Sequence, residues 1–512
     1  MGSQYVLGLK AVNCQNGETL TQKQVTAASK EKVVEALGGA ASKLRGELGE
    51  SLATVQKFDV PVEATTSSLE ALRAYSMGVR AQGDAESLPY FKRAVELDPD
   101  FALAYAAMGR VYRVFHEDSL RTGSIKKAYE LRDRVSEREK WRLSVDYYTL
   151  VTDEVDKAIQ AADAWGQNYP RDPDAHQGLA AAYRRLGQFD KALAQYEVAL
   201  RLDPNDGSSY GVVALMYMHL NRLDEATTIL QQARARKLDH SLLHGDLYDL
   251  AFLRGDTAGM QQQLEWAAGR PGDEAYFLNM QSDTEAYYGR LEKAREFSRR
   301  AVQSAIRADL KDTAAHWQAL AALRQAMFGN SQGAERDVVA ALALSRDGSV
   351  ISVSAETLAR VGDDAGAERL VGEMERSQPS EKPGEERFPT LRAVMEINKG
   401  NADQAVALLD VLAPRELWFS LGPAYLRGEA YLVGHNGVAA AAEFQKLLDH
   451  RSLVRHELTG ALAHLQLGRA FALTGDTTNA KIAYQDFLTL WKDADPDIPI
   501  LKEAKAEYEK LK

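Results

Sequence analysis

Residues 173–204 read PDAHQGLAAAYRRLGQFDKALAQYEVALRLDP and carry the strongest structural signal in this chain of 512 residues. Small side chains recur where two antiparallel helices would cross closely, at Ala180, Ala192 and Ala199. The larger side chains that would fill the space between helices are Leu179, Tyr183 and Tyr196. Gly187 suits the end of the first helix because it tolerates positive φ, and Pro204 cannot continue the second. The stretch therefore predicts a helical hairpin that packs on further copies of itself.

The same pattern recurs along most of the chain and resembles the tetratricopeptide repeat. One copy follows Ser67, and another opens with DFALAYAAMGRVY at 100–112, for which LRDRVSEREKWRL at 131–143 is predicted as a longer, charged second helix. Degenerate copies show a turn glycine and an alanine five residues later: Gly289 with Ala294, Gly329 with Ala334, Gly362 with Ala367, and Gly400 with Ala405. We count about twelve hairpins. The sequence therefore predicts an all-α fold, a right-handed superhelical solenoid.

Composition divides this array into parts. The segment SQPSEKPGEERFP at 377–389 is rich in proline, serine and charge, which predicts a flexible linker. It would separate an N-terminal part of the array, 67–376, from a C-terminal part, 390–495. Residues 496–512 include LKEAKAEYEKLK, a helix predicted to cap the last repeat or, in an alternative interpretation, to bind a partner.

The first 66 residues do not follow the repeat. Residues 5–12 alternate apolar and polar side chains, Asn16-Gly17 is a hairpin turn signal, and residues 18–25 can return as the paired strand. A helix is predicted next, with Ser29 as its N-cap. Its apolar face would comprise Val33, Val34, Leu37, Leu44, Leu48 and Leu52. A hairpin and one helix bury too little to fold alone. We therefore expect 1–66 to be half of a small α/β domain cut from a longer reading frame, or to pack on the first repeats.

Charge and composition exclude several classes of function. The net charge is -11 with acidic and basic residues interspersed, which argues against a nucleic-acid partner. The single cysteine, Cys14, excludes an internal disulfide. No apolar run is long enough for a membrane span, and no basic and apolar leader follows Met1, so we expect no direct membrane insertion. The sequence leaves the cellular compartment undecided. We expect a soluble chain, either alone or as the extracytoplasmic or cytoplasmic part of a membrane-anchored parent protein.

No catalytic or metal-binding motif is complete. Two spacings resemble metal sites: His240 with His244, and Asp493 with Asp495 and Asp497. The histidines lack a Glu or Cys at ligand spacing, and the aspartates lack the turn Gly and the terminal Glu of a calcium loop. Gly38-Gly39 lacks the Lys-Ser/Thr of a phosphate loop, and no G-x-S-x-G is present. The sequence therefore predicts no enzyme activity, no metal and no cofactor.

The order of segments resembles the C-terminal region of bacterial eukaryotic-like serine/threonine protein kinases, especially the acidobacterial type. The likeness is carried by segments that include SQYVLGLKAVNCQNGETL, ELRDRVSEREKW, YPRDPDAHQGLAAAYRRLGQFDKAL and AYQDFLTLWKDADPDIPILKEAKAEY. In that family a kinase domain precedes a membrane span, a small TolB-like domain and a sensing or docking repeat array. The resemblance implies a partial TolB-like domain at 1–66. The Gly-rich loop, the H-R-D loop and the D-F-G motif are absent from this sequence, so kinase activity is not implied.

Function is expected on the concave face of the array, because stacking of neighbouring hairpins covers the other faces. The candidate groove residues are Arg110, Arg113, Gln177, Arg184, Arg185, Met218, His219, Asp249, Asn279, Asp283 and Tyr287. Arginine forks suit the carboxylates of an acidic peptide. The sequence therefore predicts a non-enzymatic scaffold or sensor module that binds a peptide or partner protein. The alternatives are the regulatory half of a membrane-associated kinase signalling system and an unrecognised enzyme; the oligomeric state is open.

Overall fold

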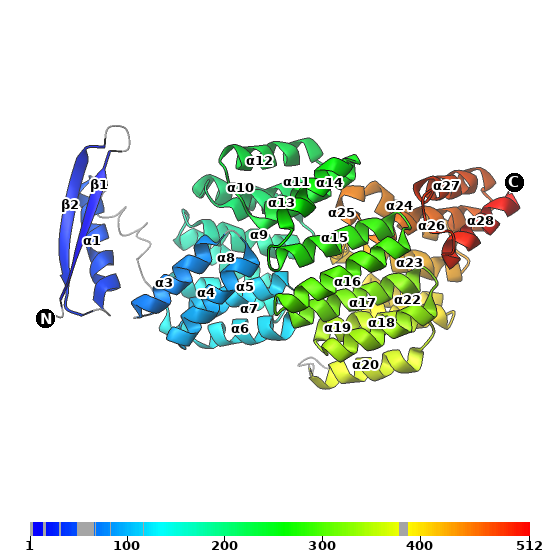
Figure 1. The fold of residues 1–512 in the computed structure, drawn as a ribbon, viewed down its shortest axis with the longest axis horizontal. Helices are drawn as coiled ribbons and strands as arrows, with labels where there is room; N and C mark the ends of the chain where they lie inside the picture. The colour runs from blue at the N-terminus through cyan, green and yellow to red at the C-terminus, as the bar shows by residue number, and fades with distance from the viewer. Residues whose placement is uncertain are drawn as a thin grey trace. The chain divides into compact units, whose positions relative to one another are not determined.

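The structure, a computed structural model, describes residues 4–13, 17–29, 32–48, 66, 68–81, 83–115, 117–377 and 388–511. The chain divides into two compact units (Figure 1). The first comprises Met1–Arg113, Leu120–Tyr183 and Lys191–Ser209, and the second comprises Val114–Ser119, Arg184–Asp190 and Tyr210–Lys512. Most of the predicted linker, residues 378–387, lies outside the described residues.

The N-terminal part of the first unit is an antiparallel hairpin with one helix. Strand β1 (Tyr5–Val12) has the predicted bounds and pairs with β2 (Thr19–Ala27), Tyr5 lying opposite Ala27. Helix α1 (Val33–Glu47) packs on the hairpin, and its Glu47 carboxylate accepts a 2.9 Å hydrogen bond from Thr21. The predicted positions Cys14, Asn16 and Leu52 lie outside the described residues.

The predicted N-cap of this helix is wrong. Lys32 occupies the N-cap position, and its side chain makes no capping bond. An N-cap side chain must directly precede the first helical residue to reach the amides of the first turn. Helical geometry begins at Val33, so Ser29 is too far upstream; its carbonyl instead accepts a hydrogen bond from the Lys32 amide.

The rest of the described chain forms twelve consecutive helical hairpins. The first four are α3 (Leu69–Arg80) with α4 (Asp84–Leu97), α5 (Ala102–Val114) with α6 (Asp118–Glu130), α7 (Glu137–Leu150) with α8 (Val155–Asn168), and α9 (Pro173–Arg185) with α10 (Phe189–Leu202). The next four are α11 (Gly207–His219) with α12 (Leu223–Ala235), α13 (Ser241–Arg254) with α14 (Thr257–Ala267), α15 (Asp273–Tyr287) with α16 (Leu291–Arg307), and α17 (Lys311–Met327) with α18 (Ser331–Leu344).

The last four hairpins contain two irregular insertions. The pairs are α19 (Gly348–Arg360) with α20 (Asp364–Ser377), α21 (Pro389–Asn398) with α22 (Ala402–Asp410), α23 (Gly422–Val433) with α24 (Gly437–Asp449), and α26 (Leu458–Thr474) with α27 (Thr477–Leu490). A 3-10 turn, η3 (Ala413–Arg415), precedes α23, and the short helix α25 (Arg451–Val454) precedes α26. Helix α28 (Pro499–Leu511) ends the chain. The predicted fold class, an all-α array of hairpins after a small two-stranded sheet, is confirmed.

The hairpins pack as their small residues predict. Ala180, Ala192 and Ala199 are completely buried, and Gly187 has a φ of 69°. In the eleventh hairpin, a Cβ added to Gly428 would lie 2.6 Å from the ring of Phe444, so the two helices touch through a position that holds no side chain. Close helix crossing therefore depends on residue size at a few positions.

The charged segment 131–143 is not the second helix of its hairpin, contrary to the sequence prediction. The second helix is α6, which ends at Glu130, and a 3-10 turn follows at Arg132–Arg134. Ser136 then begins α7 with a capping box, because its hydroxyl accepts from the Glu139 amide while the Glu139 carboxylate accepts from the Ser136 amide. The segment thus joins two hairpins, and its charge pattern masked a helix start.

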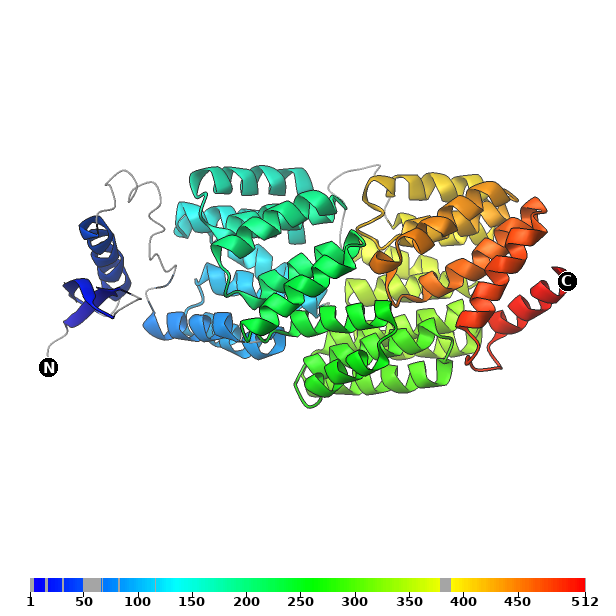
Figure 2. The ribbon, with the colours of Figure 1, turned by 90° about the horizontal axis from the view of Figure 1, so that it is seen from above.

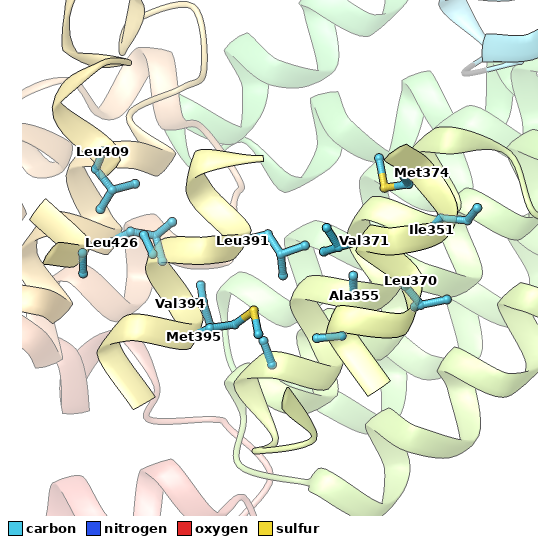
Figure 3. Close-up of a cluster of buried hydrophobic side chains, with 14 of the residues drawn as sticks. Ile351, Ala355, Leu370, Val371, Met374, Leu391, Val394, Met395, Leu409 and Leu426 are labelled. Atoms are coloured by element: carbon cyan, nitrogen blue, oxygen red, sulfur yellow. The ribbon is translucent and has the colours of Figure 1, made fainter. Parts of the chain in front are cut away.

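The core of the second unit continues from one hairpin into the next. In Figure 3, Val371 from α20 lies beside Leu391 from α21, and Ile351, Met374 and Met395 belong to the same cluster. Leu409 and Leu426 extend this cluster into α22 and α23. Figure 2 shows these helices in yellow and orange, beside the C-terminal helices in red. Within the described ranges, no helix is long and apolar enough to cross a bilayer.

Candidate functional site

The predicted groove residues fall in two groups. Arg110, Arg113 and Gln177 belong to the first unit; the other eight belong to the second. In the first unit, polar side chains link the first helices of successive hairpins. Arg110 on α5 donates to Asp146 on α7, and Gln177 on α9 donates to Ser209 on α11 at 3.1 Å. Arg113 is exposed.

In the second unit, the turn between α25 and α26 lies against the first helices of earlier hairpins. Arg455 at this turn has a φ of 54° and a ψ of -125°, and its guanidinium forms an ion pair with Asp249 on α13. The His456 ring lies 3.1 Å from the other carboxylate oxygen of Asp249 and meets the rings of Tyr248 and Phe252 edge-on. Residues about two hundred positions apart therefore form one buried polar cluster.

The pKa values of Asp246 and Asp249, one helical turn apart on α13, are shifted in opposite directions. Burial alone would raise the pKa of Asp249, but the charges of Arg455 and His456 outweigh burial and hold it below its usual range. Burial raises the pKa of Asp246 well above its usual range, and the Asp249 charge adds to the rise. Asp246 is 2% exposed and its Oδ2 has no hydrogen-bond partner. Burial therefore favours the protonated form of Asp246, whereas the neighbouring positive charges favour the ionised form of Asp249.

His219, at the end of α11, is buried in the same region. Its ring centroid lies 4.6 Å from that of Phe189, and neither ring nitrogen has a hydrogen-bond partner. Burial lowers its pKa well below the usual value, and the positive charges of Arg455 and Arg184 act in the same direction. His219 is therefore neutral at physiological pH.

Three predicted residues are engaged mainly in packing and internal bonds. Met218 is completely buried, and Tyr287 is 5% exposed with its ring edge-on to Phe252. Asn279, on α15, is buried and donates to Asp283 at 3.1 Å. These side chains have little surface to offer a ligand.

Asp283 on α15 links this helix to α17. Its carboxylate pairs with Arg324, whose guanidinium also donates to Ser282 and Ser298. The Asp283 side chain nevertheless remains 23% exposed. This carboxylate therefore anchors two hairpins to each other and keeps part of its surface open.

Arg184 and Arg185 are covered by the insertion before α23. Their guanidinium groups lie 5.4 and 5.1 Å from the ring centroid of Trp418. Arg415 donates a 3.1 Å hydrogen bond to the Arg185 carbonyl, and a Cβ on Gly187 would lie 3.1 Å from Leu417. Repeat periodicity did not reveal this contact, because the insertion falls between two repeats. Its only signal in the sequence is APRELWFSL at 413–421, which breaks the repeat register.

The histidine and aspartate spacings noted in the sequence serve local structure. His240 caps α13 by accepting from the Leu242 amide, while His244 bonds to Gln263 and Asp239 and stacks on Trp266 at 3.7 Å. Among the residues that the structure describes, no three His, Cys, Asp or Glu side chains are grouped to hold a metal.

Near Arg455, side chains of both charges surround the partly exposed ring of Tyr276. Tyr276 on α15 is 39% exposed as a whole, but its hydroxyl is buried. Burial raises the pKa of this hydroxyl, the charges of Asp249 and Asp283 add to the rise, and Arg455 opposes it. Burial raises the pKa of Glu457 to about 7 although Arg455, His456 and a hydrogen bond from Ser420 oppose the rise. We call Tyr276, Asp283, Arg455 and Glu457 the inner-wall site.

Comparison with known proteins identifies one repeat directly. The family model described as "Tetratricopeptide repeat" matches residues 173–206. Superkiller protein 3 of Schizosaccharomyces pombe is 23% identical over a region that covers 37% of this chain and 17% of that protein. The chain thus spans less than a fifth of the length of this curated relative.

Solved structures of low identity also align with the chain. The Cut9–Hcn1 hetero-tetramer of the APC/C has 12% identity and a TM-score of 0.31, covering 86% of this chain and 95% of the matched chain. A monomeric IFIT1 mutant with m7Gppp-AAAA has 15% identity and a TM-score of 0.37, covering 74% and 89%. Yeast Tom70 has 16% identity and a TM-score of 0.32, covering 81% and 96%. The kinase resemblance stays a prediction, whereas a tetratricopeptide repeat at 173–206 is established.

Proposed function

We propose that this chain is a non-enzymatic scaffold that binds an extended peptide or a partner protein on the inner face of its hairpin array. The observation that carries the proposal is the inner-wall site, where Tyr276 stays 39% exposed although the residues around it are packed. Tyrosine supplies apolar area and a polar tip, and is enriched where proteins recognise partners. Stacked hairpins leave this face for recognition.

The chemistry of the site favours a basic residue in the partner. Glu457 contributes a carboxylate, whereas Asp249 already matches the charge of Arg455 and Arg324 that of Asp283. A lysine or arginine beside Glu457 would favour its ionised form and gain a charge-assisted hydrogen bond. This differs from the acidic peptide that Arg184 and Arg185 suggest, because Trp418 covers both arginines. An acidic partner remains a prediction for the first unit, where Arg113 is exposed.

Partner capture by the full chain tests the proposal. The intact chain and a Tyr276→Ala/Glu457→Gln variant would be used to retain proteins from extract of the source cell. Glu335→Gln is the matched control, because Glu335 is exposed on the second helix of its hairpin, α18. We expect the inner-wall variant alone to lose partners while its far-UV circular dichroism shows that it remains folded. Identical sets of captured proteins for all three would contradict the proposal.

The non-enzymatic part has its own test. Relatives of the kind that the sequence resembles carry a kinase domain, so the purified chain would be assayed for phosphotransfer from radiolabelled ATP. We expect no turnover above that of a heat-denatured sample. Measurable turnover would favour the alternative of a catalytic protein.

We also propose that the N-terminal hairpin belongs to a larger α/β unit. One face of β1 carries Val6 and Val12, which are 61% and 44% exposed, while the other face contacts α1. A hairpin with open edges is a template for further strands of its own domain or of another chain. Extension of the chain at its N-terminus should therefore lower the exposure of Val6 to solvent, measured by hydrogen exchange of its amide.

A further inference from the structure

A cavity of about 470 Å³ lies in the second unit, among the last turns of α17, α19, α21 and α23 and the helices α26 and α28. Aliphatic side chains form much of its wall, chiefly Val394, Ile397, Leu432 and Leu462. Val433, which is 39% exposed, also lines it and so lies at the mouth. Ligand sites in proteins have this size and combine apolar walls with few polar groups.

Three charged side chains line the cavity: Arg360, Glu429 and Arg469. Arg469 is matched by helix α28, since its Nε and Nη2 donate to the two oxygens of Glu507 at 3.0 and 2.9 Å. A second carboxylate of α28, Glu503, lies 3.3 Å from the same guanidinium. The charge of Arg469 is therefore fully matched without a ligand.

The charge of Glu429 is less well matched. Its two oxygens lie 3.5 and 3.3 Å from Arg360 Nη1, whereas Arg360 Nε donates to Glu356 at the shorter distance of 3.1 Å. Arg360 and Arg469 thus contact four carboxylates between them, of which only Glu429 lines the cavity. The Glu429 side chain is only 18% exposed, so water cannot fully solvate the excess negative charge.

The titration of Glu429 is consistent with this shortage of positive charge. Burial raises its pKa, and Arg360 offsets only part of the rise. The charged groups that face it are Arg360 and Glu356 from α19 and Arg469 from α26, while the neighbouring hydroxyl of Tyr425 is neutral because burial raises its pKa further. A second positive charge near Glu429 would favour its ionised form.

We propose that this cavity binds a primary aliphatic amine, with the ammonium group on Glu429 and the chain against Val394, Ile397, Leu432 and Leu462. An ammonium group has three donors. Besides the Glu429 carboxylate, the Asn398 amide oxygen is an available acceptor, because the Asn398 nitrogen donates to the Ala359 carbonyl. A ligand carboxylate would add to the excess of negative charge, so anionic chains of the same length are excluded. This inference is independent of partner binding at the inner-wall site.

Calorimetric titration of the full chain tests the proposal, with n-hexylamine as probe at pH 8 and 1-hexanol and hexanoate as equally long neutral and anionic probes. We expect hexylammonium to bind at least about tenfold more tightly than hexanol, because a charge-assisted bond supplies that factor. Hexanoate should not bind. Because burial raises the pKa of Glu429, affinity should rise with pH as this carboxyl ionises.

Two variants locate the site. Glu429→Gln should lose about tenfold in affinity for hexylammonium and none for hexanol. Glu335→Gln is the matched control and should bind as the parent does. Val433→Trp narrows the mouth of the cavity and keeps the Glu429 carboxylate, so it should weaken the binding of both hexylammonium and hexanol. This variant locates the site if Glu429→Gln does not fold. Four results would overturn the proposal. They are tighter binding of hexanoate than of hexylammonium, equal affinities for hexylammonium and hexanol, no heat on titration with hexylamine, and an affinity for hexylammonium that is unchanged in both variants.

Discussion

The indole nitrogen of Trp491 donates a 3.0 Å hydrogen bond to the backbone carbonyl of Tyr287, which lies 204 residues earlier in the chain. The residues after Trp491 continue this contact. The Asp495 amide donates to the Gly289 carbonyl at 3.1 Å, and its carboxylate accepts from the Glu292 amide at 2.8 Å. The end of the last hairpin thus binds the turn between α15 and α16, so the second unit closes on itself.

Replacement of Trp491 by Phe should destabilise the chain by about 1–2 kcal/mol, because the buried carbonyl of Tyr287 loses its donor from Trp491 and a smaller ring fills the site. Urea unfolding followed by circular dichroism measures this. Trp266→Phe is the control, since the buried indole nitrogen of Trp266 has no hydrogen-bond partner. A larger loss for Trp266→Phe than for Trp491→Phe would show that the Trp491 bond contributes little.

Ala192→Leu should cost about 1–3 kcal/mol, because Ala192 is completely buried at a helix crossing and extra methylenes must displace the neighbouring helix. The adjacent Lys191 is exposed, so Lys191→Leu should change the free energy of unfolding by no more than about 0.5 kcal/mol. Thermal and urea unfolding of both variants give the comparison. Equal losses would contradict the packing register of this hairpin.

Glu457 should make stability fall as pH rises between about 4.5 and 7. Its pKa is raised to about 7 in the folded chain from an ordinary value near 4.5, so the folded state binds more protons in this interval. Glu457→Gln removes that dependence. The melting temperature of the variant relative to the parent should therefore rise from pH 4 and level off above about pH 7.

The parent retains a second slope of the same sign, because burial also raises the pKa of Glu117 to about 7. Only the difference between the variant and the parent isolates Glu457. A difference that stays constant from pH 4 to pH 8 would mean that Glu457 ionises normally in the folded chain.

Charge reversal at Arg184 and Arg185 should lower the melting temperature as well as any binding of an acidic partner. Both guanidinium groups lie over the Trp418 ring, and cation–π contacts at partly exposed sites contribute about 0.5–1 kcal/mol each. Trp418→Leu should lower the melting temperature similarly while keeping both charges. Reversal that weakens partner capture at an unchanged melting temperature would instead assign both arginines to recognition alone.

Local residue chemistry was sufficient to predict the repeating hairpins. Residue size at Ala192 and the backbone freedom of Gly187 act within one hairpin and recur with a fixed period, so they are readable along the chain. The same periodicity gave a wrong prediction near Ser136, where the charged sequence was assigned to a second helix although a new helix, α7, begins there. The groove prediction did include residues that meet in space, since Asp249 and His219 both lie near Arg455.

Sequence periodicity could not predict which earlier helices the irregular segments contact. Trp418 against Arg185, Arg455 against Asp249 and Trp491 against Tyr287 each join residues that are about two hundred positions apart. Repeat position marks the earlier residue of each pair as a groove candidate but gives no sign of the later one. Such contacts depend on the accumulated rotation of many hairpins, to which each contributes a small angle set by its own packing. Hence the amino-acid order specifies each hairpin, whereas folding of the whole second unit decides which inner-face residues are buried and which stay open to a ligand.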